Sequence, residues 1–599
     1  MSMTDAAFIP ATREEAAARG WHAVDIVIVT GDAYVDSPFI GAAVIARVLE
    51  AAGFRVGIIA QPDTGTSHDI TRFGEPRLFW GVTAGALDSM VANFTASGKR
   101  RRDDDLTAGG INRRPDRACI VYANLIRRYF KQTRPIVLGG LEASMRRMSH
   151  YDVWDNAVRR SVLVDAKADV LVYGMGEQAV VEIARRLDGG RPIADVPGTC
   201  VLERTPRAGY EIVPGHDQVA TDHRAFNEAF RAMHAAAEPG RTCGLCQQQD
   251  TRWLVHHPPQ PPLHPRQLDA LYELPYRHDA HPSELVRGPV KALDTIRCAI
   301  TTHRGCFGDC SFCTIAAHQG RTVVSRTEES ILREVETMTR RPGFTGIISD
   351  VGGPTANMYG MGCTAGHPPC VSRRCTYPEP CPRLNICHDR IIRLLSRIRA
   401  VPGVRKAFVA SGVRHDLVIA DARDGKRYLR ELAAHHISGQ LKIAPEHTEE
   451  RVLRLMGKPG PQVLRTFKRW FDHANREGGT RWFLTYYFIA AHPGCDETAM
   501  RSAADFIRRE LHISPEQVQV FTPLPGTRSA AMYHTGMEPD SGERIFVERT
   551  IRGALRQKAI LGAGRPQSGT RTTPGQYQPR TERTGTRRRA RGRRGKHRT

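Results

Sequence analysis

The sequence lacks any long hydrophobic run. No stretch of its 599 residues approaches the roughly 18 consecutive apolar residues of a membrane span. Its start, MSMTDAAFIPATREEAAARG, lacks the basic segment and apolar core of a signal peptide. Aromatic residues make up only 7%, but hydrophobic residues reach 41% and charged residues 25%, which is ordinary for globular domains. We therefore expect a folded cytoplasmic protein with no membrane contact.

Acidic residues are scarce at the carboxyl-terminal end of the chain. Residues 564–599 contain twelve Lys or Arg and one acid, about half of the net charge of +23. The segment is poor in apolar residues and rich in Gly, Pro and Thr, so we predict a disordered basic tail over 563–599. Two interpretations stay open: contact with the phosphates of RNA or the ribosome, and a solubilising extension.

Short apolar runs alternate with helical patterns over the first 200 residues. VDIVIVT (24–30) and RVGIIA (55–60) are typical of strands, and they flank a helical pattern at 40–52. Further strands are predicted at 118–124, 135–144 and 168–177, and a further helix at 179–187. This order indicates parallel strands with right-handed crossovers. We predict an N-terminal parallel-sheet α/β domain over 1–200.

Glycine turns follow two of these strands, as Gly139-Gly140 and Gly174-Met175-Gly176-Glu177, and both are site candidates. Open α/β sheets bind ligands at the carboxyl ends of their strands, although glycine also simply permits tight turns. The layout resembles the cobalamin-binding domains that precede many radical enzymes. It lacks their Asp-x-His-x-x-Gly motif, so a histidine ligand to cobalt is not expected. Residues 201–290, with five prolines between 258 and 265, are predicted to be a connector.

Eight of the 14 cysteines lie in two short segments, which favours metal ligation over disulfides in a reducing cytosol. The first segment follows a predicted strand at 294–302 and contains Cys306, Cys310 and Cys313. Three thiolates within eight residues suit a cubane cluster with one iron left open. A zinc site and a fortuitous spacing are the alternatives.

Phe312 stands immediately before the last of these cysteines. With that aromatic residue, the CxxxCxxC motif resembles the signature of the radical SAM superfamily. The resemblance implies a 4Fe-4S cluster whose open iron binds S-adenosylmethionine. One electron from the cluster then yields methionine and a 5'-deoxyadenosyl radical. It also implies a single-electron donor such as a flavodoxin or ferredoxin.

The following apolar runs predict a partial (β/α)6 barrel over 291–562, so the fold class is α/β throughout. Gly352-Gly353-Pro354 stands where radical SAM proteins have a Gly-Gly-Glu-Pro-like turn that binds the nucleoside-methionine ligand, here without the Glu. We expect Glu446 to bind ribose hydroxyls, and Ser411 or Arg414 to bind the methionine carboxylate. The alternative is that these polar residues only cap strand ends. No other catalytic residue is predicted.

The second cysteine group lies in a segment rich in Pro and Gly, at 363–387. Its spacing matches no standard zinc knuckle. A second cluster, a structural zinc and reduced thiols without metal all remain open for its five members, which are Cys363, Cys370, Cys375, Cys381 and Cys387.

Several longer segments resemble the YgiQ family of radical SAM proteins. They include GDAYVDSP (31–38), GGLEASMRR (139–147), RGCFGDCSFC (304–313) and LKIAPEHTEE (441–450). The resemblance runs from about residue 7 to about residue 560 and implies a radical SAM enzyme whose substrate is not identified. The alternative is a non-catalytic, metal-stabilised protein that binds nucleic acid.

Overall fold

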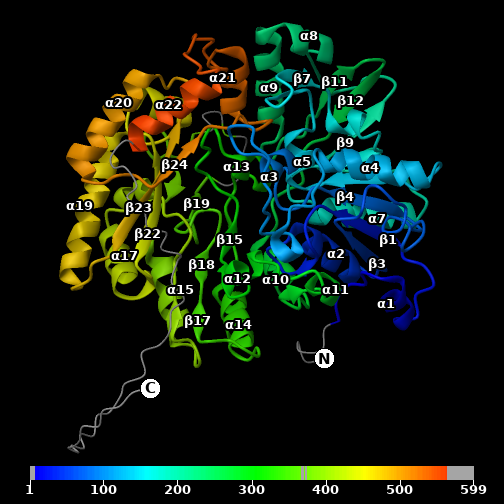
Figure 1. The fold of residues 1–599 in the computed structure, drawn as a ribbon, viewed down its shortest axis with the longest axis horizontal. Helices are drawn as coiled ribbons and strands as arrows, with labels where there is room; N and C mark the ends of the chain where they lie inside the picture. The colour runs from blue at the N-terminus through cyan, green and yellow to red at the C-terminus, as the bar shows by residue number, and fades with distance from the viewer. Residues whose placement is uncertain (1–6, 366–369, 371–373, 563–599) are drawn as a thin grey trace, which may run out of the picture. The chain divides into compact units, whose positions relative to one another are not determined.

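The computed structural model describes residues 7–365, 370 and 374–562 (Figure 1). The predicted basic tail therefore lies outside the described residues, as does part of the cysteine-rich segment. Among the helices of the described part, none is both long enough and apolar enough to cross a membrane.

A nine-stranded sheet organises the N-terminal half, on the right of Figure 1, in the order β10-β11-β12-β9-β8-β5-β4-β1-β3. The five strands from β3 to β8 in that order are parallel, as predicted. The parallel strands are β1 (Ile26–Thr30), β3 (Val56–Ala60), β4 (Phe79–Thr83), β5 (Ile136–Gly139) and β8 (Val170–Val172). Helices α2 (Gly41–Ala51) and α7 (Glu177–Asp188) follow β1 and β8 in the chain and contact each other.

Two parts of this sheet differ from the sequence prediction. Residues 118–124 are not a strand but the start of helix α4 (Ala118–Tyr129), and the strand β4 was not predicted. An uninterrupted apolar run suits a buried strand and a buried helix equally well. Part of the segment expected as a connector extends the sheet through four strands, β9 (Thr199–Glu203), β10 (Glu211–Val213), β11 (Leu245–Gln249) and β12 (Arg252–His256).

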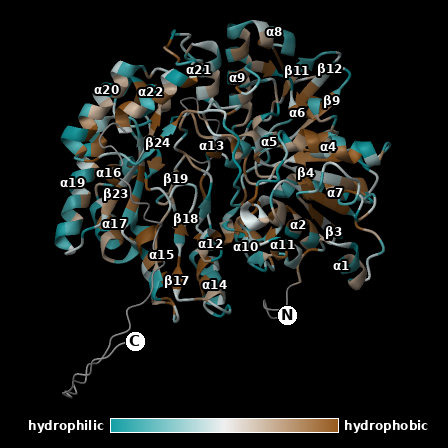
Figure 2. Cartoon of the chain, in the orientation of Figure 1, coloured by the Kyte–Doolittle hydropathy of each residue, from teal (hydrophilic) through white to brown (hydrophobic). Residues whose placement is uncertain are grey.

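Alternation along the strands builds one core on each face of the sheet. Val27 and Val29 pack in the core beneath α4, and Ile26 and Ile28 pack in the core beneath α2 and α7. Figure 2 shows the hydrophobic residues gathered at β4 and α4, whereas the outer helix α19 (Pro461–Glu477) is largely hydrophilic.

The second half contains the predicted partial barrel, and its parallel strands occur as short paired segments. They are β14 (Ala299–Thr301), β17 (Ile347–Ile348), β18 (Asp350–Gly352), β21 (Lys406–Ala407), β22 (Gln440–Glu446), β23 (Phe483–Ala490) and β24 (Gln517–Val520). β14 pairs with β18, β17 with β21, and β22 with β23 and then β24. An isolated parallel bridge joins Val413, which follows β21, to Ile443 in β22. The carboxyl ends of these strands therefore share one rim.

Candidate functional site

The three cysteines of the CxxxCxxC motif lie on one loop at this rim, and we call it the cluster loop (residues 305–313). The loop follows β15 (His303–Arg304), and Cys313 caps helix α13 (Thr314–Gln319). Gly305 has φ +83°, and a Cβ there would lie 2.0 Å from the Thr322 carbonyl oxygen. Only glycine fits this close return of the backbone.

Polar groups surround the sulfurs. Arg414 donates a hydrogen bond from Nη1 to Cys310 Sγ at 3.6 Å, and Thr355 Oγ1 lies 3.5 Å from Cys306 Sγ. Burial raises the pKa of Cys306, and it raises the pKa of Cys313 to about 12 together with the neighbouring cysteines. Iron stabilises thiolates, so cluster binding would release protons from these groups.

The donor set fits a cubane. The cysteines are free thiols, and they come from one short loop with a buried cation beside it. In the described part of the chain, no three His, Cys, Asp or Glu side chains converge as ligands of a single ion. A cubane spreads its thiolates over different irons and does not require such convergence.

A cavity of about 570 Å³ lies between the N-terminal sheet and the barrel, and we call it the sheet-edge cavity. One wall comes from the carboxyl ends of β1, β4, β5 and β8, including Gly139, Gly140 and Gly174. The opposite wall comes from β14, β18 and α13, including Thr314, the neighbour of Cys313. The two glycine turns noted in the sequence therefore line a cavity beside the cluster loop.

The structure brings together three of the residues predicted to bind S-adenosylmethionine. Gly352, Gly353 and Ser411 all line the sheet-edge cavity. Ser411 donates hydrogen bonds from its backbone N–H and its hydroxyl to Asp350, which fixes its position. A Cβ at Gly353 would lie 2.6 Å from His303 Cε1, so the turn packs flat against that imidazole ring.

The other two predicted residues are not among those that line the cavity. Arg414 is held by Asp416, with Nη2 2.5 Å from Oδ2, and also reaches Thr376 and Cys310. Glu446 is buried with Lys458 Nζ 3.7 Å from its carboxylate, and burial raises its pKa. Arg414 is thus a neighbour of the cluster loop.

Sequence reasoning missed His303 and Arg304, which line the cavity together with Glu177, the last residue of a glycine turn already noted in the sequence. Arg304 and Glu177 form a buried ion pair that joins the barrel to the N-terminal domain. His303 is fully buried, and its burial lowers its pKa to about 4, so the ring is neutral. The one available signal was a run of polar residues directly after a predicted strand.

The described part of the cysteine-rich segment folds over the cluster loop. Cys375 and Cys381 pack with Cys306 and Phe307 in one small apolar cluster. Cys363 and Cys370 are exposed, and residues 366–369 and 371–373 lie outside the described chain.

Comparison with known proteins places this geometry in a family. Residues 8–299 match the family model described as Radical SAM N-terminal, and residues 300–507 match the Radical SAM superfamily model. A UPF0313 protein of Fusobacterium nucleatum is 45% identical over 558 residues, which cover 92% of this chain and 98% of that protein. The chain belongs to the UPF0313, or YgiQ, family. Another UPF0313 protein, from Thermotoga maritima, is 48% identical over 554 residues, which cover 91% of this chain and 96% of that protein.

The fold is also shared with a solved structure. The radical S-adenosylmethionine methyltransferase TsrM from Kitasatospora setae, with cobalamin and a 4Fe-4S cluster bound, matches with a TM-score of 0.50 at 15% identity. The match covers 90% of this chain and 91% of that one. The predicted family, fold class and enzyme class of this YgiQ-family protein are therefore confirmed: it is a radical SAM enzyme.

Proposed function

We propose that Cys306, Cys310 and Cys313 hold a 4Fe-4S cluster and that S-adenosylmethionine binds at the adjoining wall of the sheet-edge cavity. The observation that carries the proposal is the position of α13, which begins directly after Cys313 and forms part of that wall. When bound, the cluster supplies one electron to the sulfonium, giving methionine and a 5'-deoxyadenosyl radical that acts on a substrate not yet identified.

The residues of the chain have distinct parts in this proposal. The Gly352-Gly353 turn offers backbone groups to the amino end of the ligand. Ser411 would donate its hydroxyl proton to the ligand's carboxylate once released from Asp350, which accepts that proton in the free protein. The Arg304–Glu177 pair and the wall of β-strand ends separate the reacting atoms from water. Arg414 neutralises negative charge beside Cys310.

The test is anaerobic reconstitution with iron and sulfide, followed by quantification of 5'-deoxyadenosine after addition of S-adenosylmethionine and dithionite. We expect brown iron–sulfur absorption and deoxyadenosine in the wild type. Cys306→Ala should produce no deoxyadenosine and should lose the part of the absorption that comes from the cluster loop. Cys243→Ala is the matched control, because Cys243 is exposed and lies in the N-terminal domain. Deoxyadenosine at the same level in Cys306→Ala would refute the proposal.

Two accessory parts follow from the same proposal. A single-electron donor such as a flavodoxin or ferredoxin would replace dithionite in the cell. A second cluster or a zinc at the five cysteines of 363–387 stays a prediction. The test is to measure bound iron and zinc in the wild type and in the double variant Cys375→Ala/Cys381→Ala. If the segment binds metal, the double variant should contain less metal than the wild type but keep the iron of the cluster loop.

A further inference from the structure

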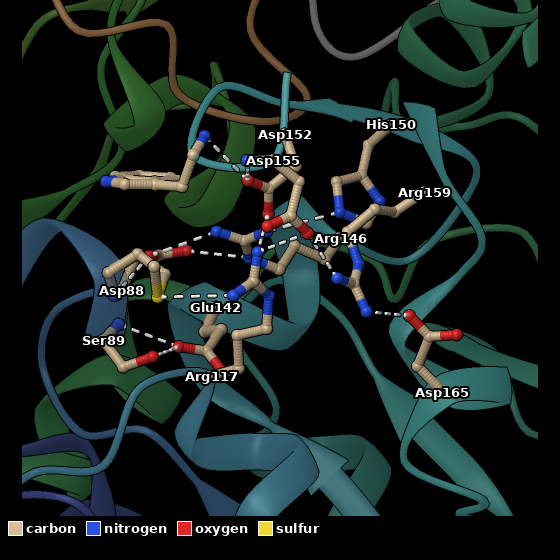
Figure 3. Close-up of polar contacts among 12 residues, drawn as sticks. Asp88, Ser89, Arg117, Glu142, Arg146, His150, Asp152, Asp155, Arg159 and Asp165 are labelled. Carbon is tan, nitrogen blue, oxygen red and sulfur yellow. Dashed lines mark hydrogen bonds and ion pairs between the residues drawn. The ribbon is translucent and has the colours of Figure 1, made fainter. Parts of the chain in front are cut away.

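Two consecutive arginines of the GGLEASMRR segment have opposite surroundings. Arg146 is enclosed by carboxylates, with Nε 3.0 Å from Asp88 and Nη1 2.9 Å from Asp152 (Figure 3). Arg147 is only 3% exposed, and within the described part of the chain it forms no ion pair. A buried cation without a counter-charge is costly, so this arrangement needs an explanation.

The guanidinium of Arg147 is held in place by neutral groups. Nε donates to His256 Nε2 at 3.1 Å, and Nη1 donates to the Ser144 carbonyl oxygen at 2.6 Å. The group also lies over the ring of Tyr173, with its carbon 5.0 Å from the ring centre. Burial lowers the pKa of Arg147. These contacts orient the guanidinium but leave its charge uncompensated, and Nη2 has no hydrogen-bond partner among the described residues.

Arg147 lines a second cavity of about 140 Å³, which we call the arginine cavity. The two other arginines on its wall are both paired: Arg304 with Glu177, and Arg321 with Glu238. The unpaired positive charge of this cavity therefore belongs to Arg147.

The arginine cavity adjoins the sheet-edge cavity. Gly174, Glu177, Arg304 and His318 line both of them. The Ser144 hydroxyl donates its one proton to the Gly140 carbonyl oxygen, so His318 Nδ1, 3.1 Å away, must be the donor to Ser144. Nε2 of the neutral ring is then an acceptor. The wall shared by the two cavities thus carries a hydrogen-bond acceptor, His318 Nε2.

We propose that Arg147 binds an oxyanion group, either a carboxylate or a phosphate, in the arginine cavity. Charge-assisted hydrogen bonds from a pre-oriented guanidinium are the strongest that such a group can receive. The further assignment of this oxyanion to the substrate rests on the proposed function, since the cavity adjoins the proposed binding site of S-adenosylmethionine. On that assignment, the radical acts on an anionic substrate that is anchored through Arg147.

The test uses the reconstituted full chain and its melting temperature. The protein is titrated with inorganic phosphate and, separately, with acetate, against potassium chloride at equal ionic strength. A ligand that binds only the folded state raises the melting temperature in a saturable manner. A melting temperature that rises to a plateau with phosphate or with acetate supports the proposal. The anion that gives the plateau shows whether the site prefers a phosphate or a carboxylate. A response to both ions no greater than that to chloride overturns it.

Variants tie the response to the residue. We expect Arg147→Gln and Arg147→Met to weaken the apparent affinity for the active anion by about tenfold or more, because the charge-assisted bonds are lost. Methionine fills a similar volume without a charge, so it keeps the test valid if glutamine at this position impairs folding. Arg185→Gln is the matched control: it removes the same charge from an exposed site on α7. Unchanged affinity in both Arg147 variants contradicts the proposal.

The measurement also separates this inference from the proposed function. Anion binding is recorded without S-adenosylmethionine, and deoxyadenosine is recorded without added phosphate or acetate. Saturable anion binding without deoxyadenosine preserves the site and removes its assignment to a radical substrate. Deoxyadenosine without saturable anion binding leaves the proposed function intact and overturns the Arg147 site.

Discussion

The Arg414 guanidinium donates to the Cys310 sulfur at 3.6 Å while Asp416 holds it from the other side at 2.5 Å. Two segments about a hundred residues apart thus place a fixed positive charge beside one proposed cluster ligand, Cys310. Reduction of a cluster adds negative charge, which this cation stabilises.

We expect Arg414→Gln to lower the midpoint potential of the cluster by an amount on the order of tens of millivolts, because that stabilisation is lost. Redox titration followed by electron paramagnetic resonance measures the shift. Arg326→Gln is the control, since Arg326 forms a buried pair with Glu334 elsewhere in the barrel. Equal shifts in both variants would show that the effect reports general loosening of the barrel.

Gly353→Ala should weaken binding of S-adenosylmethionine and destabilise the fold by about 1–3 kcal/mol, because the new methyl group meets the His303 ring at 2.6 Å. Equilibrium dialysis and urea unfolding measure the two effects. Gly362→Ala is the control, since a Cβ there meets nothing within 4 Å.

A second substitution identifies the clash as the cause. His303→Ala replaces the imidazole ring by a methyl group. Combined with Gly353→Ala, it should restore much of the stability that Gly353→Ala loses, and the difference from additivity is the coupling energy between the two positions. Strictly additive losses in the double variant would rule out the steric explanation.

The carboxylate cage around Arg146 predicts a large stability effect. Arg146→Gln leaves buried Asp88 without its ion-pair partner and leaves Asp152 with Arg117 alone, so we expect a loss of about 3–5 kcal/mol in the free energy of unfolding. Arg159 belongs to the same network in Figure 3, but its side chain is 29% exposed, so its pairs with Asp155 and Asp165 are both open to water. Arg159→Gln should therefore cost less than about 1 kcal/mol. Denaturant unfolding of both variants provides the comparison.

Stability should fall as the pH falls below about 6.5. Burial lowers the pKa of His492 to about 3, while the unfolded chain has the ordinary value near 6.5. The unfolded state thus binds a proton first, and the stability present above pH 6.5 is lost progressively towards pH 3.

A variant isolates this contribution. His492→Asn should reduce the slope of unfolding free energy against pH by up to about one proton in that range. The same slope in wild type and His492→Asn would show that His492 does not carry the effect.

His492 also illustrates how distant segments orient the cluster loop. Its Nε2 lies 2.7 Å from the Ser529 hydroxyl, which lies 2.8 Å from the Ser311 hydroxyl between Cys310 and Phe312. Nothing in the local pattern around any of these residues indicates the chain of contacts. The hydrogen-bond chain from His492 to Ser311 forms because strands β23 and β24 bring residues 492 and 529 to the same rim.

The sequence by itself determined the local chemistry. Three cysteines at short spacing predict a cluster wherever the loop lies, and alternating strand and helix patterns imply parallel strands because the connections leave few other topologies. The same local logic failed at 118–124, where an apolar run carries no periodicity and only packing against the sheet selects a helix.

Tertiary structure alone decided what faces the cluster loop. Gly352 and Ser411 meet on one cavity wall, while Glu446 pairs with Lys458 away from that wall. Arg146 and Arg147 are adjacent and chemically identical, yet Arg146 is enclosed by carboxylates and Arg147 forms no ion pair with any residue that the structure describes. That difference depends on which side chains distant segments deliver, because electrostatic compensation acts across space and leaves no trace in the local sequence.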